Sequence, residues 1–128
     1  MGQDRDTGAA ANDFGRATAP QIAKQIGATM LGSASNEATL DGKRVVIKCA
    51  RRRTTSVGVT YLMLSKLDRV IGAFEQDDGS FALHALPASR FKAEMRESKS
   101  QGASAGKVGL VSRKVFESTG ESLGAVSL

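Results

Sequence analysis

Three side chains within twelve residues have the chemistry that phosphodiester hydrolysis requires. Glu37 and Asp41 supply carboxylates, and Lys48 supplies an ammonium group. Carboxylate oxygens are ligands that Mg²⁺ prefers, and a cation beside the attacked phosphate stabilises the charge that develops there. The sequence therefore predicts a magnesium ion held by Glu37, with Asp41 or a backbone carbonyl, and it predicts Glu37 and Lys48 as the catalytic pair.

The same three residues have a structural alternative. Glu37 and Lys48 could form a cross-strand ion pair, which on a protein surface contributes only about 0–1 kcal/mol. Asp41 precedes Gly42, and Asp-Gly is a common turn sequence. Both interpretations stay open on the sequence.

Positive charge is concentrated around Lys48. The chain has a net charge of +5, and residues 43–69 hold eight lysines and arginines against one acid. Such a block repels itself unless it is solvated or faces an anion. We therefore predict contacts to nucleic-acid phosphates from Lys43, Arg44, Arg51, Arg52, Arg53, Thr54 and Thr55. A solvated loop is the alternative, and the two threonines could instead cap a following helix.

A predicted hairpin positions these residues. Residues 37–40 and 44–50 are predicted strands, and an Asp-Gly turn joins them. Alternation along the second strand places Lys48 on the face opposite to Ile47. Because adjacent strands of a hairpin lie about 5 Å apart, the first acid and the lysine can approach each other.

The rest of the chain supplies the elements around this hairpin. Apolar spacing predicts a helix over residues 59–67, and the apolar run at 70–74 predicts a strand buried on both faces. The intervening helix makes this strand a predicted parallel neighbour of 44–50. Other predicted elements are a first helix from Thr18 or from near Asp13, a turn at Asp78-Gly79, a strand from Phe81, a short helix after Pro87, a strand at 107–111 and a helical turn between Ser112 and Gly120.

The order of elements predicts an α/β fold with a central mixed sheet of four to five strands flanked by helices. A chain of 128 residues fits one domain. We expect a flexible N-terminal segment over residues 1–13, a core over 14–97, a linker over 98–106 and a C-terminal strand and helix extension over 107–128.

The element order and the stretch Glu-Ala-Thr-Leu-Asp-Gly-Lys-Arg-Val-Val-Ile-Lys, which ends at Lys48, resemble the restriction-endonuclease-like, or PD-(D/E)XK, nuclease superfamily. The resemblance covers about residues 14–97 and implies an α-β-β-β-α-β core. In that family an acid on the second strand precedes a hairpin turn, and the next strand carries an acid-x-lysine motif. Glu37 matches the first acid and Lys48 the lysine, whereas Val46 stands where the family has its second acid.

The resemblance implies a Mg²⁺-dependent DNA endonuclease of the restriction or repair type. It would act on double-stranded or structured DNA as a homodimer, so that two sites address two strands. Val46 favours a second hypothesis, a catalytically inactive DNA-binding module on the same fold. A third hypothesis is a protein-interaction domain whose basic loop binds an acidic partner protein.

Composition argues against several other classes. No apolar run is long enough to cross a membrane, the start of the chain does not resemble a secretory signal, and a single cysteine argues against a disulfide framework, so a cytoplasmic location is predicted. One cysteine and one histidine also argue against a structural zinc site. Cys49 is predicted to be a buried, unreactive thiol, and His84 a packed residue instead of a catalytic base.

Overall fold

The computed structural model describes residues 3–32, 36–97 and 107–128, and of residues 3–16 it describes the burial and contacts of positions 14 and 15 only. In chain order the elements are α1 (Gln3–Ile26), β1 (Thr29–Met30), β2 (Glu37–Leu40), β3 (Lys43–Ala50), β4 (Ser56–Thr60), α2 (Tyr61–Leu64), β5 (Arg69–Glu75), β6 (Phe81–Pro87), α3 (Ala88–Glu94), β7 (Arg96–Glu97), β8 (Val108–Ser112), α4 (Arg113–Thr119) and β9 (Glu121–Val126).

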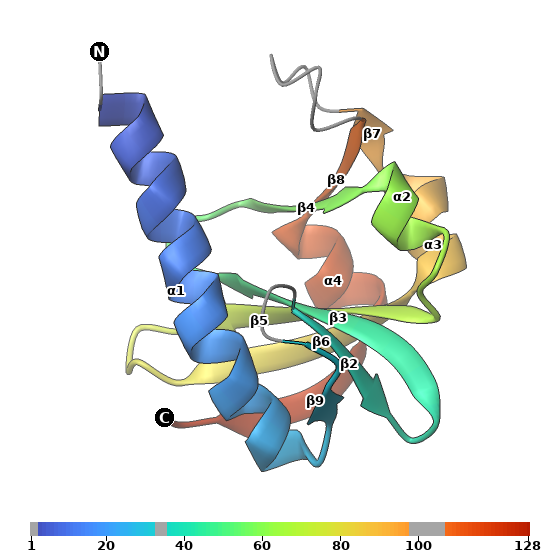
Figure 1. The fold of residues 1–128 in the computed structure, drawn as a ribbon, viewed down its shortest axis with the longest axis horizontal. Coiled ribbons are helices and arrows are strands. Elements are labelled where there is room, and N and C mark those ends of the chain that lie inside the picture. Colours follow the sequence, from blue (N-terminus) through green and yellow to red (C-terminus); the bar gives the residue numbers. More distant parts are fainter. Residues whose placement is uncertain (1–2, 33–35, 98–106) are drawn as a thin grey trace.

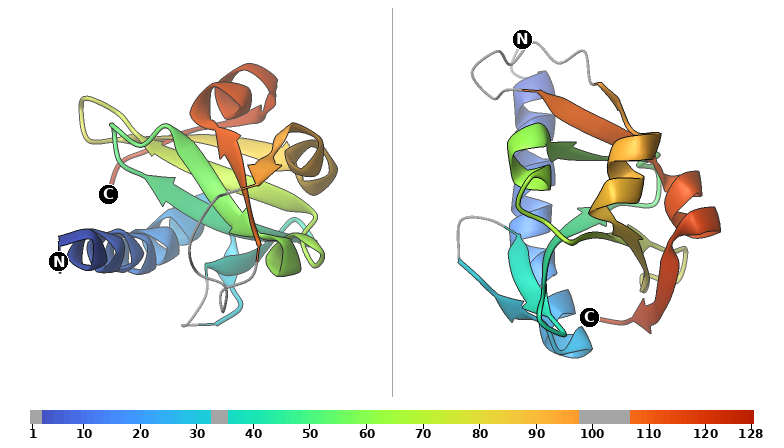
Figure 2. Two further views of the ribbon diagram at one scale, coloured as in Figure 1. Left: turned by 90° about the horizontal axis from the view of Figure 1, so that it is seen from above. Right: turned by 90° about the vertical axis from the view of Figure 1, so that its right-hand side faces the viewer.

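A six-stranded sheet forms the centre of the fold, in the order β1-β2-β3-β5-β6-β9. Strands β3 and β5 are parallel, and every other neighbouring pair in this sheet is antiparallel. Helix α1 covers one face. A second sheet, of order β4-β8-β7, and the helices α2, α3 and α4 lie over the other face (Figure 1, Figure 2). The described part of the chain is therefore a layered α/β structure.

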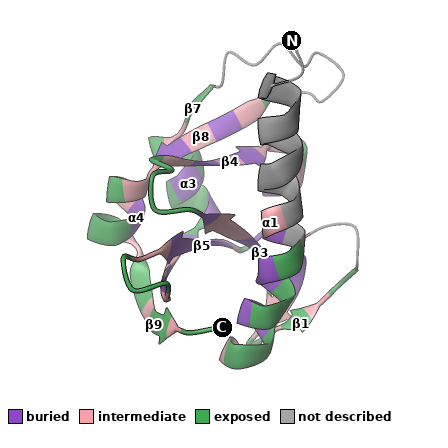
Figure 3. Cartoon of the chain, turned by 90° about the vertical axis from the view of Figure 1, so that its left-hand side faces the viewer, coloured by how far each residue is buried: buried purple, intermediate pink, exposed green. Residues whose placement is uncertain are grey.

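Two apolar clusters, one on each face of the central sheet, hold these layers together. Ile47 and Ile71 of the sheet pack with Ile22 of α1 in the first cluster. Val46 packs with Phe116 of α4 in the second. All five side chains are at most 1% exposed, and burying an aliphatic or aromatic side chain of this size contributes about 1.5–3 kcal/mol. The most deeply buried strands of the central sheet thus lie between the helices (Figure 3).

The predicted hairpin and the predicted parallel pair are confirmed. Strands β2 and β3 pair across a two-residue turn, in which Asp41 has φ 54° and Gly42 has φ 78°. Positive φ at both central residues is what a type I′ hairpin turn requires, so Asp41 acts as a turn former. Strand β5 runs parallel to β3, with Lys48 opposite Gly72, and it turns back into β6 as expected. The mixed α/β class is confirmed as well, but the central sheet has six strands instead of the expected four to five, and a second sheet of three strands accompanies it.

The helix predicted over residues 59–67 is wrong. Strand β4 occupies the beginning of this segment, and α2 is a single turn after it. Val57 and Val59 point inward from the strand, while Leu62 is 75% exposed. The apolar spacing that suggests one helix therefore comes from two short elements of different type.

The two ends of the chain also differ from expectation. Helix α1 begins at Gln3, earlier than Thr18 or Asp13. Strands β7 and β9 are not foreseen by the sequence patterns, and β9 pairs with β6 at the edge of the central sheet. Residues 107–128 therefore contribute to both sheets. The linker expected at 98–106 lies outside the described residues.

Candidate functional site

The β2–β3 hairpin places Glu37 and Lys48 on the same face of the central sheet. Glu37 lies directly opposite Val46 in the register of the hairpin. Lys48 follows Val46 by two residues, and side chains two residues apart on a strand share a face. This is the face covered by the second sheet, away from α1. The hairpin thus meets the first geometric requirement of the predicted site.

Glu37 is ion-paired with Arg44, which is a different cation from the predicted one. The Oε2 atom of Glu37 accepts a hydrogen bond from Nε of Arg44 at 3.0 Å and lies 2.9 Å from its Nη2. Glu37 is only 8% exposed, so the guanidinium compensates a carboxylate that has lost most of its water. The backbone N–H of Arg44 donates to the Asp68 carboxylate at 2.8 Å. Arg44, predicted as a phosphate contact, is therefore occupied within the fold.

The residues around Glu37 do not fit a magnesium ion. Val46 occupies the position beside it and is 1% exposed within an apolar cluster. Asp41 lies in the exposed turn four residues further along, about 13 Å away at the usual rise of a strand. Magnesium ligands lie about 2.1 Å from the ion, so Glu37 and Asp41 cannot share one. No group of three or more acidic, histidine or cysteine side chains suited to a metal occurs among the described residues.

Lys48 is a largely buried ammonium group. It has no hydrogen-bond or ion-pair partner within residues 36–97 or the other described segments. Burial lowers the pKa of Lys48 below 10.5, and the neighbouring Cys49 opposes this shift weakly. An unpaired cation in such a position costs stability. The residue therefore has the unusual environment that often accompanies function, without the acid that the family motif would supply.

We expect Lys48→Met to raise the free energy of unfolding by about 1–2 kcal/mol at pH 7, because methionine removes the buried charge and keeps the length of the side chain. The lowered pKa means that folded protein binds fewer protons than unfolded protein between the folded pKa and 10.5, so the wild type gains stability as the pH rises through this window. The difference in the free energy of unfolding between Lys48→Met and the wild type should therefore become smaller as the pH rises.

Urea denaturation at pH 7 and at pH 10.5 measures this effect. Lys66→Met is the matched control, because Lys66 is exposed, and it should change the stability by less than about 0.5 kcal/mol. A lower stability of Lys48→Met than of the wild type at pH 7 would contradict the expected cost of the buried ammonium.

The other two potentially reactive side chains are partly buried. Burial raises the pKa of the Cys49 thiol to about 12, so it stays protonated near neutral pH and is a poor nucleophile. The ring of His84 packs 6.1 Å from the ring of Phe74, and its Nδ1 atom is buried without a hydrogen-bond partner. Neither residue forms a catalytic arrangement with another described side chain.

The predicted phosphate contacts divide into two groups at opposite ends of β3. Lys43 and Arg44 begin the strand, whereas Arg51, Arg52 and Arg53 follow its end. The six residues 45–50 of extended chain lie between the two groups, so Arg44 and Arg51 are roughly 23 Å apart along the strand. The fold therefore does not form a single continuous basic surface along this segment.

The segment 51–55, hereafter the basic loop, is held to α4 and β5 by hydrogen bonds. The backbone N–H of Arg113 donates to the Thr55 carbonyl at 2.8 Å, and its Nη1 donates to the Arg52 carbonyl at 3.0 Å. The backbone N–H of Arg52 donates to a Glu75 carboxylate oxygen at 3.2 Å. Thr54 donates its N–H back to the Arg51 carbonyl at 2.9 Å. These bonds fix the backbone from which the arginine side chains extend.

The three arginines of the basic loop are exposed and differ in their contacts. The guanidinium of Arg51 lies over the ring of Phe14, 4.1 Å from its centroid. Arg52 approaches the fully exposed Asp77 at 3.8 Å, which is a weak surface pair. Arg53 has no ion-pair or hydrogen-bond partner among the described residues. The side chains of Arg52 and Arg53 are therefore accessible to an anionic ligand, which would displace water from them and the weak contact with Asp77.

The threonines of the basic loop do not cap a helix, because the next element is β4. The cap of α2 is Thr60, whose Oγ1 accepts from the Met63 N–H at 3.1 Å. Thr54 and Thr55 are exposed, and Thr55 lines a pocket instead.

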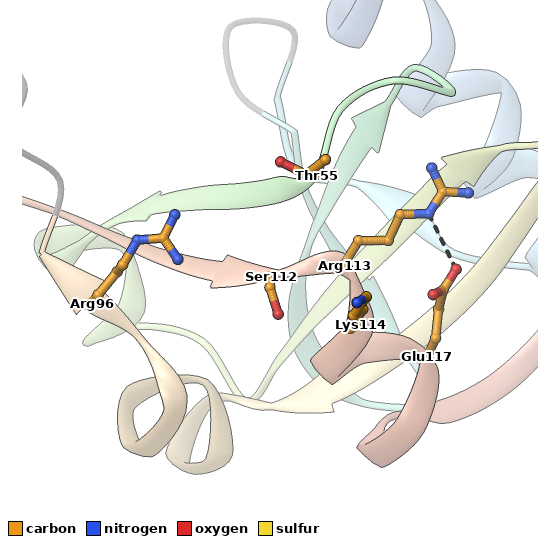
Figure 4. A pocket seen from close by; sticks show the side chains of 6 residues that line it. All are labelled: Thr55, Arg96, Ser112, Arg113, Lys114 and Glu117. Carbon is orange, nitrogen blue, oxygen red and sulfur yellow. Dashed lines mark hydrogen bonds and ion pairs between the residues drawn. The ribbon is translucent and has the colours of Figure 1, made fainter.

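This pocket lies beside the basic loop and has a volume of about 460 Å³. Figure 4 shows Arg96 at one end, Lys114 and Glu117 at the other, and Thr55 and Ser112 between them. The sequence patterns identified Thr55 only. Ser112 was visible as the start of a helix, but nothing in the sequence brings Arg96 close to α4.

No described helix is both long and apolar enough to cross a membrane. Comparison of the chain with protein-family models and with curated proteins gave no match.

Proposed function

We propose that this chain is a DNA-binding module that contacts the phosphate backbone of double-stranded or structured DNA through the basic loop, without metal-dependent cleavage. The observation that carries the proposal is the loop itself. Its exposed arginines extend from a backbone that Arg113 and Glu75 hold in place. A fixed backbone lowers the entropy lost when a ligand binds, and guanidinium groups suit phosphate oxygens.

Two features support binding over cutting. Val46 is buried in the position of the second acid, and Arg44 already neutralises Glu37. One part of the strand arrangement supports the resemblance to restriction-endonuclease-like proteins, since an antiparallel hairpin is followed by a strand parallel to its second member. The connection between these two strands departs from the implied core, because it contains β4 and one helical turn in place of a full helix. A scaffold of that kind with an incomplete metal site can still contact DNA through its cations.

A salt titration of duplex binding tests the proposal. With three to four phosphates contacted, log K should fall with log[salt] with a slope of roughly −2.7 to −3.6, so the affinity should drop roughly 40- to 150-fold between 50 and 200 mM salt. Fluorescence anisotropy of a labelled 20-base-pair duplex in EDTA measures this. Absence of binding at 50 mM salt would refute the proposal and would favour an acidic protein partner for the basic loop.

A Mg²⁺-dependent endonuclease is the second candidate, and one observation favours it. Glu37 and Lys48 share a face of the hairpin, as the family motif requires. Incubation with supercoiled plasmid, in Mg²⁺ or in EDTA, separates the two functions. Nicking that needs Mg²⁺ and disappears in Glu37→Gln would establish cleavage, and light scattering would then show whether the active species is the expected homodimer.

A further inference from the structure

The pocket beside the basic loop has an unusual lining for its size. Its six lining residues are all polar, and three are cations: Arg96 of β7 with Arg113 and Lys114 of α4. A volume of about 460 Å³ falls within the range of small-molecule sites. Most of the exposed lining is the aliphatic part of these side chains, and their charged and hydroxyl groups are the polar atoms that the pocket offers, with no aromatic side chain for stacking a base.

Two of these lining residues satisfy each other. Nε of Arg113 donates to the Glu117 carboxylate at 3.1 Å, and the same guanidinium donates to carbonyls of the basic loop and of β5. The charges of Arg113 and Glu117 thus cancel within the wall of the pocket (Figure 4).

Two cations and two hydroxyls remain for a ligand. Arg96 and Lys114 are exposed, and neither has a hydrogen-bond or ion-pair partner in the described part of the chain. Ser112 makes no side-chain hydrogen bond to the helix that it precedes, and the Thr55 hydroxyl has no bond to another described residue. A guanidinium, an ammonium and two hydroxyls together are donors suited to phosphate oxygens.

We infer that this pocket binds the phosphate group of a phosphomonoester. The two unpaired cations, at the two ends of the pocket, carry a charge of +2, which matches the −1.5 to −2 that a phosphomonoester carries at pH 7. Both side chains are long and exposed, so both can turn towards one phosphate group between them. A diester within a DNA strand carries one negative charge and leaves one cation uncompensated. The two sources of such a group are a 5′-phosphorylated nucleic-acid end and a free mononucleotide.

If the phosphate group belongs to the end of a DNA strand, the inference rests on the proposed function. If it belongs to a free mononucleotide, the inference does not. Arg113 connects the two sites, because its backbone N–H donates to the Thr55 carbonyl and its side chain holds the basic loop. A duplex that contacts the loop near one of its ends would have that end close to the pocket.

An NMR titration of the 13.4 kDa chain with deoxyadenosine 5′-monophosphate, and with deoxyadenosine as control, tests the pocket. We expect the monophosphate to shift the amide signals of Thr55, Ser112 and Lys114 and the nucleoside to leave them unchanged. The double variant Arg96→Gln/Lys114→Gln should weaken the monophosphate five- to tenfold. Lys66→Gln/Lys92→Gln, which removes the same charge from exposed lysines elsewhere, should change its affinity less than twofold.

Two further duplexes, with a 5′-phosphate or a 5′-hydroxyl end, separate the sources. If the protein binds the 5′-phosphorylated duplex more tightly than the 5′-hydroxyl duplex, and Arg96→Gln/Lys114→Gln removes this difference, the pocket binds DNA ends. Monophosphate binding without such a preference assigns it to a free phosphorylated ligand. The inference is overturned if neither probe binds, if the nucleoside binds equally well, or if both double variants lose the same affinity. Salt-dependent binding of the 5′-hydroxyl duplex would then still support the proposed function by itself.

Discussion

Arg52→Gln/Arg53→Gln is expected to lower the affinity for duplex DNA roughly 60-fold at 100 mM salt. Each phosphate contact contributes about 0.9 to the slope of log K against log[salt], so the loss of two contacts should reduce the slope by about 1.8. At 0.1 M salt, this change of slope corresponds to a binding constant that is roughly 60-fold lower. Arg51 is left unchanged because its guanidinium also packs on Phe14. Anisotropy titrations at three salt concentrations measure both the affinity and the slope.

The control for the loop variant is Lys66→Gln/Lys92→Gln, with the same change in net charge. Both lysines are exposed and lie outside the loop and the pocket. If binding depends on the loop, the control should lose less than about threefold in affinity. An equal loss in the two variants would mean that the DNA responds to the total charge of the protein, and the assignment of the loop would fail.

Local sequence signals predicted the hairpin that carries Glu37 and Lys48. Alternation along β3 and the Asp-Gly turn act over neighbouring residues, and together they determine which side chains share a face. The parallel pairing of β3 with β5 was predicted from an intervening helix, and the pairing is confirmed although β4 and a single helical turn form the connection instead. The helix predicted over residues 59–67 was wrong because the spacing of apolar residues alone cannot distinguish a short strand followed by one helical turn from a single amphipathic helix.

The candidate site was predictable only in part, because its decisive contacts are distant in sequence. Arg113 lies 61 residues after Arg52, whose carbonyl it holds. Arg96 approaches α4 only because β7 pairs with β8. The charge count located the arginines, and the predicted strand at 44–50 already separates them from Lys43, as β3 does in the structure. Side-chain types thus indicated a phosphate ligand, and the tertiary structure selected which cations can contact it.

Phe116→Ala should cause the largest loss of stability among the changes considered. Phe116 is fully buried in α4, and its ring meets those of Phe74 at 5.4 Å and Phe91 at 6.2 Å in edge-to-face arrangements. Truncating a phenylalanine in such a core costs about 3–5 kcal/mol, from lost burial and from the cavity that remains. A domain of this size is commonly stable by about 5–15 kcal/mol, so the variant should lose a large fraction of its stability.

Urea denaturation of Phe116→Ala, Phe116→Leu and Leu62→Ala tests this role. Leucine keeps much of the buried volume and should cost clearly less than alanine. Leu62 is 75% exposed, so its truncation should change the stability by less than about 0.5 kcal/mol. Similar losses for Phe116→Ala and Leu62→Ala would show that α4 does not pack against the sheet as described. Because α4 also carries Arg113, that result would remove the support of the basic loop and the proposed DNA contact with it.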